Sequence, residues 1–332
     1  MIGNNRRRRI VLSSLLALAL AVAAVALVLY LRADKTDVFY ATRGAYRGVR
    51  VLESATGPAS RVRLVELDND RGEAVATAYV RTPRQLSPGY RILLTYAGAT
   101  TGETILHLIP ERPDLVLVAV QYPFARPHTT GEYLLSPYRV RQAVFRTVAG
   151  GMLALSYLRE TEGLKTGEVT VLGASLGSTF AVIQGALDRR VSTVLLVHGG
   201  GDFPSSLRAL ERREGRAWRG ELLAWTAAVL VDSFEPARFV HRIAPRRLVI
   251  VASRQDKYFP VAGIQALYDR AGEPKTLIWT ATEHVGARKT VLVNEIVRLI
   301  QPYFATAVAA RRPDPGPGPQ LRRSPAASTE RR

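Results

Sequence analysis

The chain of 332 residues contains no cysteine and only five histidines. The lack of cysteine excludes disulfides, thiolate nucleophiles and cysteine-ligated metals. The histidines are scattered, without the paired spacing of a metal site. No Lys-Ser or Lys-Thr follows Gly199–Gly201, so these glycines do not match a phosphate-binding loop. With no cofactor or metal indicated, the candidates for chemistry are hydroxyl, carboxylate and imidazole side chains.

Acidic residues are also scarce, 28 against 46 basic ones, which gives a net charge of +18. Arg6–Arg9 carry four of these charges, and the segment from Arg311 onward carries a net four more. The remaining charges form no block of like sign and are not interleaved with aromatic residues. Because a localised patch is the mark of nucleic-acid binding, we expect no nucleic-acid partner. Attraction to anionic lipid or to cell-envelope polymers fits this charge better.

Ile10–Leu31 is a run of 22 residues that is apolar except for two serines. As a helix it would measure roughly 30 Å, the thickness of a bilayer core. A secretory signal has a shorter apolar region that ends at a small-residue cleavage site. The "AVA" at residues 21–23 could serve as that site, but the run continues for eight residues beyond it. We therefore favour an uncleaved signal anchor over a cleaved signal.

The charges on either side of this run predict its orientation. Arg6–Arg9 precede it, whereas Arg32 and Lys35 are diluted by Asp34 and Asp37 after it. The positive-inside rule then keeps the N-terminus in the cytoplasm and places everything beyond residue 31 outside. The sequence thus predicts a single-pass protein of the cell membrane with an extracytoplasmic, or periplasmic, domain.

The exported part begins with period-2 alternation, in which "RVRLVELDNDRGEAVATAYV" indicates two strands around a turn at residues 69–72. Six continuously apolar runs follow, "RILLTY", "DLVLVAVQY", "VTVLG", "STVLLVH", "RRLVIVAS" and "KTLIWTA", as expected of parallel strands covered on both faces. Helical patterns at residues 140–159 and 178–187 separate some of them. These features predict an α/β fold with a doubly wound, mostly parallel sheet and an antiparallel N-terminal edge.

Three regions follow from this pattern. Residues 1–36 hold the cytoplasmic tip and the anchor, 37–310 the α/β domain, and 311–332 a basic tail rich in proline that we expect to be disordered. Within the domain, residues 203–243 follow the sixth predicted strand and contain two amphipathic segments that we expect to carry the tryptophans there. We interpret them as a helical insertion, or lid, that covers the site.

"VTVLGASLGSTF" at residues 169–180 places Ser175 between two glycines, after a strand and before a helical segment. This stretch resembles the G-x-S-x-G nucleophile elbow of the α/β-hydrolase superfamily. An elbow is catalytically useful only if an acid and a base also reach it. "FEPARFVHRIAPRRLVIVASRQDKYFP" resembles the stretch before the catalytic acid in that superfamily and puts Asp256 at the acid position. "TLIWTATEHVG" puts His284 in the loop after the last predicted strand.

Ser175, Asp256 and His284 occur in the chain order of that superfamily, after the fifth, seventh and eighth predicted strands. Because the carboxyl ends of parallel strands meet at one edge of a sheet, the three can converge. Asp202, after the sixth strand, is the alternative acid, and His198 is expected to shape a strand end.

The resemblance also implies backbone donors for an oxyanion. The residue after the nucleophile, Leu176, supplies one, and the "LLTYAGATTG" turn supplies another from Gly98 or Ala99. The usual His-Gly of this turn is missing. "TYAG" resembles the Tyr-x-Gly of prolyl-oligopeptidase-type peptidases, which makes the Tyr96 hydroxyl a candidate donor. The alternative is a tyrosine packed at a strand end.

The resemblance covers roughly residues 60–305 and implies a serine hydrolase, with carboxylesterase the favoured activity and a small-molecule or acyl substrate. A serine peptidase of prolyl-oligopeptidase type is the alternative within the class, although the large N-terminal propeller of those enzymes is missing. A hydrolase-like binding or scaffold protein is the alternative from another class. No motif within the chain defines the substrate or the oligomeric state.

Overall fold

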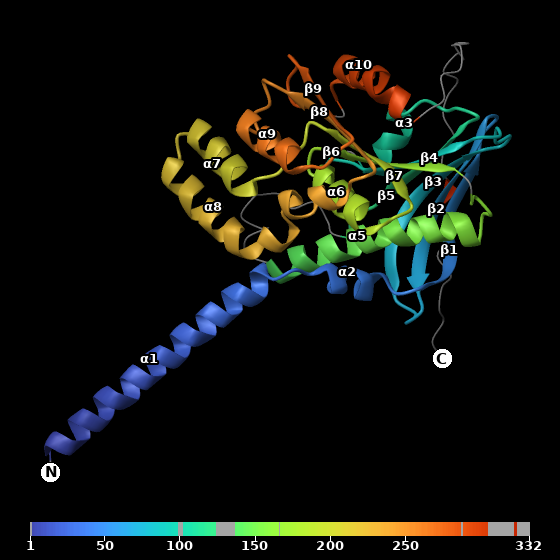
Figure 1. Ribbon diagram of the computed structural model, residues 1–332. Helices are drawn as coiled ribbons and strands as arrows, with labels where there is room; N and C mark the ends of the chain where they lie inside the picture. The colour runs from blue at the N-terminus through green and yellow to red at the C-terminus, as the bar shows by residue number, and fades with distance from the viewer. Residues whose placement is uncertain are drawn as a thin grey trace.

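The protein is described by a computed structural model that covers residues 2–98, 102–123, 137–165, 167–286, 288–304 and 322–323. Helix α1 (Ile2–Arg32) extends away from a domain built around one sheet (Figure 1). Its segment Val11–Arg32 is long and apolar enough to cross a membrane, a property that an N-terminal signal sequence shares.

The sheet has the strand order β10-β1-β2-β3-β5-β4-β6-β7-β8-β9. The strands from β5 to β9 in this order pair in parallel, whereas β10, β1, β2 and β3 form an antiparallel edge. The bounds are β1 (Tyr46–Thr56), β2 (Ser60–Asn69), β3 (Ala74–Pro83), β4 (Arg91–Tyr96), β5 (Leu115–Val120), β6 (Glu168–Ala174), β7 (Val191–Val197), β8 (Arg247–Ser253), β9 (Lys275–Thr280) and β10 (Arg322–Arg323).

The apolar patterning explains the two kinds of strand. The parallel strands β5 to β8 are buried along nearly their whole length, because helices cover both faces of this part of the sheet. In the antiparallel edge, β1 alternates between half-buried and exposed residues because one face meets solvent. The mostly parallel sheet with an antiparallel N-terminal edge is therefore confirmed. Strand β1 is additional to the predicted ones, so each later strand moves up by one number.

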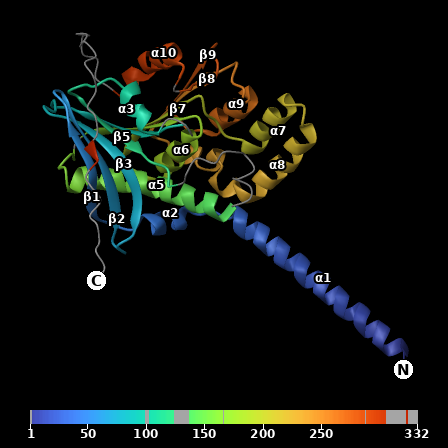
Figure 2. The same ribbon diagram turned by 180° about the vertical axis from the view of Figure 1, so that it is seen from behind.

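Two layers of helices enclose the sheet (Figures 1 and 2). Residues of α2, α5, α6 and α9 pack in one core cluster, and residues of α3 and α10 pack in a second cluster on the opposite face. The bounds are α2 (Thr36–Arg43), α3 (Ile105–Leu108), α5 (Pro137–Glu160), α6 (Gly177–Leu187), α9 (Val261–Arg270) and α10 (Thr290–Ile300).

The region 203–243 forms a helical hairpin, α7 (Phe203–Arg213) and α8 (Ala217–Leu230), followed by short 3-10 turns. Our expectation that both segments carry a tryptophan is wrong, since Trp218 and Trp225 both lie on α8. Of the tail expected to be disordered, Arg322–Arg323 pair with β1 as β10, and the rest lies outside the described residues.

Candidate active site

Ser175 occupies a sharp turn between β6 and α6. Its φ of 53° lies in the left-handed region, which is uncommon for a residue other than glycine and is held here by the surrounding structure. Its N–H donates to the carbonyl of Val197 at 2.9 Å, which keeps the turn in register with β7. A Cβ at Gly173 would clash with the Gly177 carbonyl, and one at Gly177 would clash with the Tyr96 carbonyl. The two glycines are therefore needed for the close approach of α6 to β6 and β4.

The side chains of Ser175, His284 and Asp256 form a continuous chain of hydrogen bonds. The Oγ of Ser175 lies 2.9 Å from Nε2 of His284, and Nδ1 of the same ring lies 2.6 Å from Oδ2 of Asp256. An ionised Asp256 can only accept, so Nδ1 carries the ring proton and Nε2 accepts from the serine hydroxyl. This tautomer leaves Nε2 able to take a proton from Ser175.

Asp256 is held as a charged group by its surroundings. Burial alone would raise its pKa, but the interaction with His284 and the backbone hydrogen bonds from Tyr258 and Phe259 together outweigh this and lower the pKa below its usual value. The other carboxylate oxygen, Oδ1, accepts from the N–H groups of Tyr258 and Phe259 at 2.8 and 3.1 Å. The acid is thus oriented by backbone donors on one side and by the imidazole on the other.

His198 supports the loop that carries His284. It is buried at the end of β7, where its Nδ1 accepts from the N–H of Val285 at 2.8 Å. Burial lowers the pKa of His198 to about 4, and the repulsion of His284 and Lys289 works in the same direction, against the attraction of Asp256. A neutral ring keeps the lone pair that this bond requires. His198 thus lies at the strand end where the sequence places it, and its bond to Val285 links this strand end to the loop of His284.

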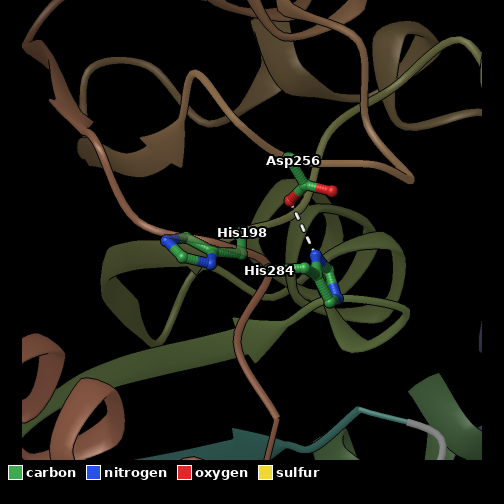
Figure 3. A group of neighbouring side chains, drawn as sticks. All are labelled: His198, Asp256 and His284. Atoms are coloured by element: carbon green, nitrogen blue, oxygen red, sulfur yellow. Dashed lines mark hydrogen bonds and ion pairs between the residues drawn. The ribbon is translucent and has the colours of Figure 1, made fainter.

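One group of side chains within the described residues could hold a metal by distance alone. It consists of His198, Asp256 and His284, whose potential ligand atoms lie within 4.8 Å of one another (Figure 3). In Figure 3 a hydrogen bond joins Asp256 to His284. The Nδ1 atoms of both histidines are engaged in hydrogen bonds, as is the Oδ2 of the carboxylate. These contacts fit a proton-handling network better than a set of metal ligands.

Two of the predicted oxyanion donors lie beside the serine. Leu176 is the N-cap residue of α6, and the N-terminus of a helix favours negative charge. Gly98 lines the cavity that contains Ser175 and His284. The hydroxyl of Tyr122, which the sequence analysis missed, donates to the carbonyl of Ala97. In a trans peptide the N–H points opposite to that carbonyl, so this bond sets the direction of the Gly98 N–H. Ala99 lies outside the described residues.

Tyr96 does not act as the predicted oxyanion donor in this structure. Its side chain is completely buried, and its hydroxyl donates to Oε1 of Gln184 at 2.5 Å. The ring packs against Phe180 at 5.7 Å. Successive side chains of a strand point to opposite faces of the sheet. At the end of β4, Thr95 and Tyr96 therefore point to opposite faces, and the face of Tyr96 is covered by the core. The alternative, a tyrosine packed at a strand end, is what the structure contains.

Asp202, the alternative acid, lies elsewhere. It caps α7, where Oδ1 accepts from the N–H of Ser205 at 3.1 Å, and its own N–H donates to Glu235 at 2.6 Å. Among the described residues, the carboxylate that contacts His284 is that of Asp256.

A cavity of about 500 Å³ opens beside Ser175 and His284. Its walls are mainly apolar and come from α3, α10 and the ends of β6 and β7, with residues such as Ile105, Ile109, Val293 and Ile296. Lys257 and Lys289 also line it. None of its described lining residues belongs to 203–243, so the cavity gives no support to the expected lid over the site.

No family model matches the sequence, and no curated protein matches it. The fold has counterparts among solved structures. An acetyl xylan esterase from Paenibacillus sp. R4 superposes with a TM-score of 0.58 at 18% identity, covering 80% of this chain and 92% of that one. Acetyl xylan esterase 1 from Thermoanaerobacterium sp. JW/SL YS485 gives 0.56 at 12% identity, covering 79% and 92%.

A third solved structure, an esterase from Pyrococcus furiosus, superposes with a TM-score of 0.51 at 11% identity and covers 74% of this chain and 91% of its own. The strand order, the serine at the turn after β6 and these superpositions agree. The chain has the α/β-hydrolase fold. In the α/β-hydrolase fold the nucleophile follows a central parallel strand, the position that Ser175 has after β6. At these identities the likeness concerns the fold alone.

Proposed function

We propose that the protein is a serine hydrolase that cleaves ester bonds through an acyl-enzyme on Ser175. The observation that carries this proposal is the unbroken hydrogen-bonded chain from Ser175 through His284 to Asp256 at the wall of a cavity. A serine hydroxyl becomes a nucleophile when a neutral imidazole takes its proton, and a carboxylate keeps that imidazole in the required tautomer.

The reaction begins when Oγ of Ser175 attacks the ester carbonyl carbon while Nε2 of His284 takes the hydroxyl proton. The carbonyl oxygen becomes an oxyanion, for which the N–H groups of Leu176 and Gly98 are the candidate donors. The tetrahedral intermediate collapses, and the imidazolium gives its proton to the departing alcohol. A water molecule then attacks the acyl-enzyme with His284 again as base, which releases the acid and restores the serine. Asp256 stabilises the imidazolium in both halves.

Three observations favour an esterase over the alternatives. The peptidase interpretation depended on a Tyr96 hydroxyl at the oxyanion site, but that hydroxyl is bound to Gln184 in the core. Three solved structures that superpose on this chain with TM-scores of 0.58, 0.56 and 0.51 are named esterases. A scaffold protein without turnover would have no need for the strained φ of Ser175 or for two backbone donors on Asp256.

The cavity suggests an apolar acyl group. Its aliphatic lining begins next to Ser175, and each methylene that it buries contributes about 0.8 kcal/mol. If that energy is realised in the transition state, kcat/KM rises by about fourfold per methylene until the cavity is filled. A series of p-nitrophenyl esters of increasing acyl length measures this directly. A kcat/KM that is highest for the acetate and falls with the first added methylene would refute it.

We also propose that α1 is an uncleaved anchor that spans the cell membrane once, with the N-terminus in the cytoplasm and the α/β domain outside. The length and apolar surface of Val11–Arg32 support a span, and the four arginines before it support the orientation. In this proposal residues 1–36 are the tip and anchor, 37–310 the hydrolase domain, and 311–332 a tail.

The test of the activity compares p-nitrophenyl esters with the corresponding anilides, using the wild type, Ser175→Ala and, as the matched control, Ser205→Ala on α7. We expect ester turnover in the wild type and control, and a loss of at least about a thousandfold in Ser175→Ala. Anilides cleaved as fast as esters would favour the peptidase, and no turnover of either would favour the scaffold.

A further inference from the structure

Helix α8 presents an apolar face to its surroundings. Trp218, Leu222 and Trp225 are 72%, 56% and 67% exposed. At 100° per residue they lie within about 60° of arc on the helix. The opposite side is made of small residues, and three of them are buried: Gly220, Ala224 and Ala227. Helix α8 therefore packs against the domain through a small-residue side and leaves its large apolar side chains outside.

This exposure is unusual in composition as well as in extent. The chain has three tryptophans, and two of them stand on this one face. Contiguous exposed apolar surface on a folded domain marks a place where something apolar binds. Tryptophan in particular is enriched at the boundary between a bilayer and water, because its ring is apolar and its N–H remains hydrated.

The end of α1 is fastened to the segment that follows α8. Nε of Arg32 lies 3.3 Å from the Asp232 carboxylate, and Arg238 donates to the Arg32 carbonyl at 2.6 Å. Just beyond the helix, Arg242 pairs with Asp34 at 2.7 Å. The hydrogen bonds from Thr36 and Arg242 to Asp34 outweigh the effect of burial and lower its pKa to about 2, so this pair stays charged at neutral pH. These contacts fix where the anchor leaves the domain.

The direction of α1 then decides what α8 faces. In both views α8 lies on the side of the domain from which α1 projects, and α7 lies on the side of α8 that is farther from α1 (Figures 1 and 2). The C-terminal end of α8 is next to the end of α1, and Trp218 lies 12 residues, or about 18 Å of helix, farther along. A bilayer that α1 crosses would therefore begin at the level of this face.

We propose that Trp218, Leu222 and Trp225 insert into the interface of the membrane that α1 spans. The proposal rests on the anchoring proposed above and is independent of the esterase chemistry. Arg212 and Arg213, in the last turn of α7, are exposed and form no ion pair with any residue that the structure describes. They lie beyond the far end of α8, where they can meet anionic headgroups.

The tryptophans themselves report on this contact. The full chain carrying Trp279→Phe, which leaves Trp218 and Trp225 as the fluorophores, is reconstituted into phosphatidylcholine vesicles with or without bromine atoms on the upper part of the acyl chains. Interfacial helices bury their apolar face about 5–10 Å into the headgroup and acyl boundary, so we expect brominated lipid to lower the emission by about twofold or more. A second measurement keeps Trp279. The loss of emission caused by brominated lipid in the wild type, minus the loss in Trp218→Phe/Trp225→Phe, is the part that comes from Trp218 and Trp225.

The matched control carries its single tryptophan on the far side of the domain. Val291 on α10 is 84% exposed, and both figures place α10 away from α1. Val291→Trp in a chain with all three natural tryptophans changed to Phe is expected to resist brominated lipid and to be quenched by acrylamide in water. This control reports what an exposed tryptophan does when it does not reach the membrane.

The possible outcomes separate the partners. Quenching by brominated lipid supports docking on the bilayer. If brominated lipid leaves the emission unchanged, the proposal is overturned. Quenching by acrylamide would then mean that the face is solvated. Protection from acrylamide would mean that a protein partner or a second copy covers it. A chain that fails to float with vesicles overturns the anchoring as well, whereas ester hydrolysis is scored separately and does not depend on any of these results.

Discussion

Replacing Asp256 with asparagine changes one carboxylate oxygen for an amide nitrogen at the atom that faces Nδ1 of His284. The side chain stays in place, because its Oδ1 still accepts from the N–H groups of Tyr258 and Phe259. The amide then presents a donor to a ring nitrogen that is itself a donor. The imidazole responds by moving its proton to Nε2, the nitrogen that lies 2.9 Å from Oγ of Ser175. In that tautomer it can no longer take the serine proton.

The size of the effect follows from this change of tautomer. A histidine held in the wrong tautomer costs about three to four orders of magnitude in kcat, and the lost stabilisation of the imidazolium is part of that cost. Folding stability should change little, since two of the three hydrogen bonds to the side chain remain. We therefore expect Asp256→Asn to fold normally and to turn over a short-chain p-nitrophenyl ester roughly 1,000 to 10,000 times more slowly.

The matched control is Asp202→Asn. Asp202 also follows a strand of the parallel sheet, but its carboxylate caps α7 instead of contacting His284. Asparagine is a good N-cap residue, so this variant should stay within about tenfold of the wild type. A crippled Asp202→Asn beside a nearly normal Asp256→Asn would refute the assignment of the acid.

Three further predictions concern the tyrosines near the site, His198 and the membrane topology. Tyr122→Phe removes the bond that sets the Ala97–Gly98 peptide and should lower kcat by roughly tenfold, whereas Tyr96→Phe should keep kcat within about threefold and cost about 1–2 kcal/mol of folding stability. Neutral His198 has a folded pKa of about 4 against 6.5 unfolded, so its contribution to stability is fully present above pH 6.5 and is lost as the pH falls to about 4. That contribution is about 3 kcal/mol. In His198→Asn the asparagine keeps a hydrogen-bond acceptor and tolerates the φ of 46° at this position. This variant should lack this part of the pH dependence of the unfolding free energy. Protease added to spheroplasts should digest the domain and spare the anchor, and neutral residues in place of Arg6–Arg9 should disturb insertion.

Each of these has a result that would contradict it. A larger loss of turnover in Tyr96→Phe than in Tyr122→Phe would return Tyr96 to the oxyanion site. Equal slopes of unfolding free energy against pH in the wild type and His198→Asn would mean that other groups set the acid limit. A domain that is protected in spheroplasts and digested only after lysis would place it in the cytoplasm.

Much of the fold could be predicted because the burial of a strand determines which residue types it contains. A parallel strand covered on both faces has no polar side, so β6 and β7 stand out as continuous apolar runs. The positions of Ser175, Asp256 and His284 follow from the same pattern, since each comes after such a run and strand ends share an edge. Their order along the chain then indicates how they meet.

What the sequence could not specify depends on side-chain direction and on packing between distant elements. "TYAG" identifies a tyrosine beside the site, but it does not specify which face of the sheet the tyrosine side chain points to. Neighbouring residues of a strand point to opposite faces, and at its position in β4 Tyr96 points to Gln184 and the core. The role of Tyr122 depends on a contact with Ala97, 25 residues away, that no local pattern encodes. The position of 203–243 after β7 predicts a lid over the site, yet α8 is next to α1, a placement set by contacts such as Arg32 with Asp232.

The most direct test of the proposed chemistry is to locate the covalent adduct that a fluorophosphonate probe forms with the full-length protein. The probe phosphonylates a serine whose hydroxyl is deprotonated by a neighbouring base, which in this structure is Ser175 beside His284. Mass spectrometry of the digested protein should find the adduct on the peptide that contains Ser175, with labelling abolished in Ser175→Ala and retained in Ser205→Ala. An adduct on any other serine, or a folded wild-type protein that takes up no probe, would contradict the account.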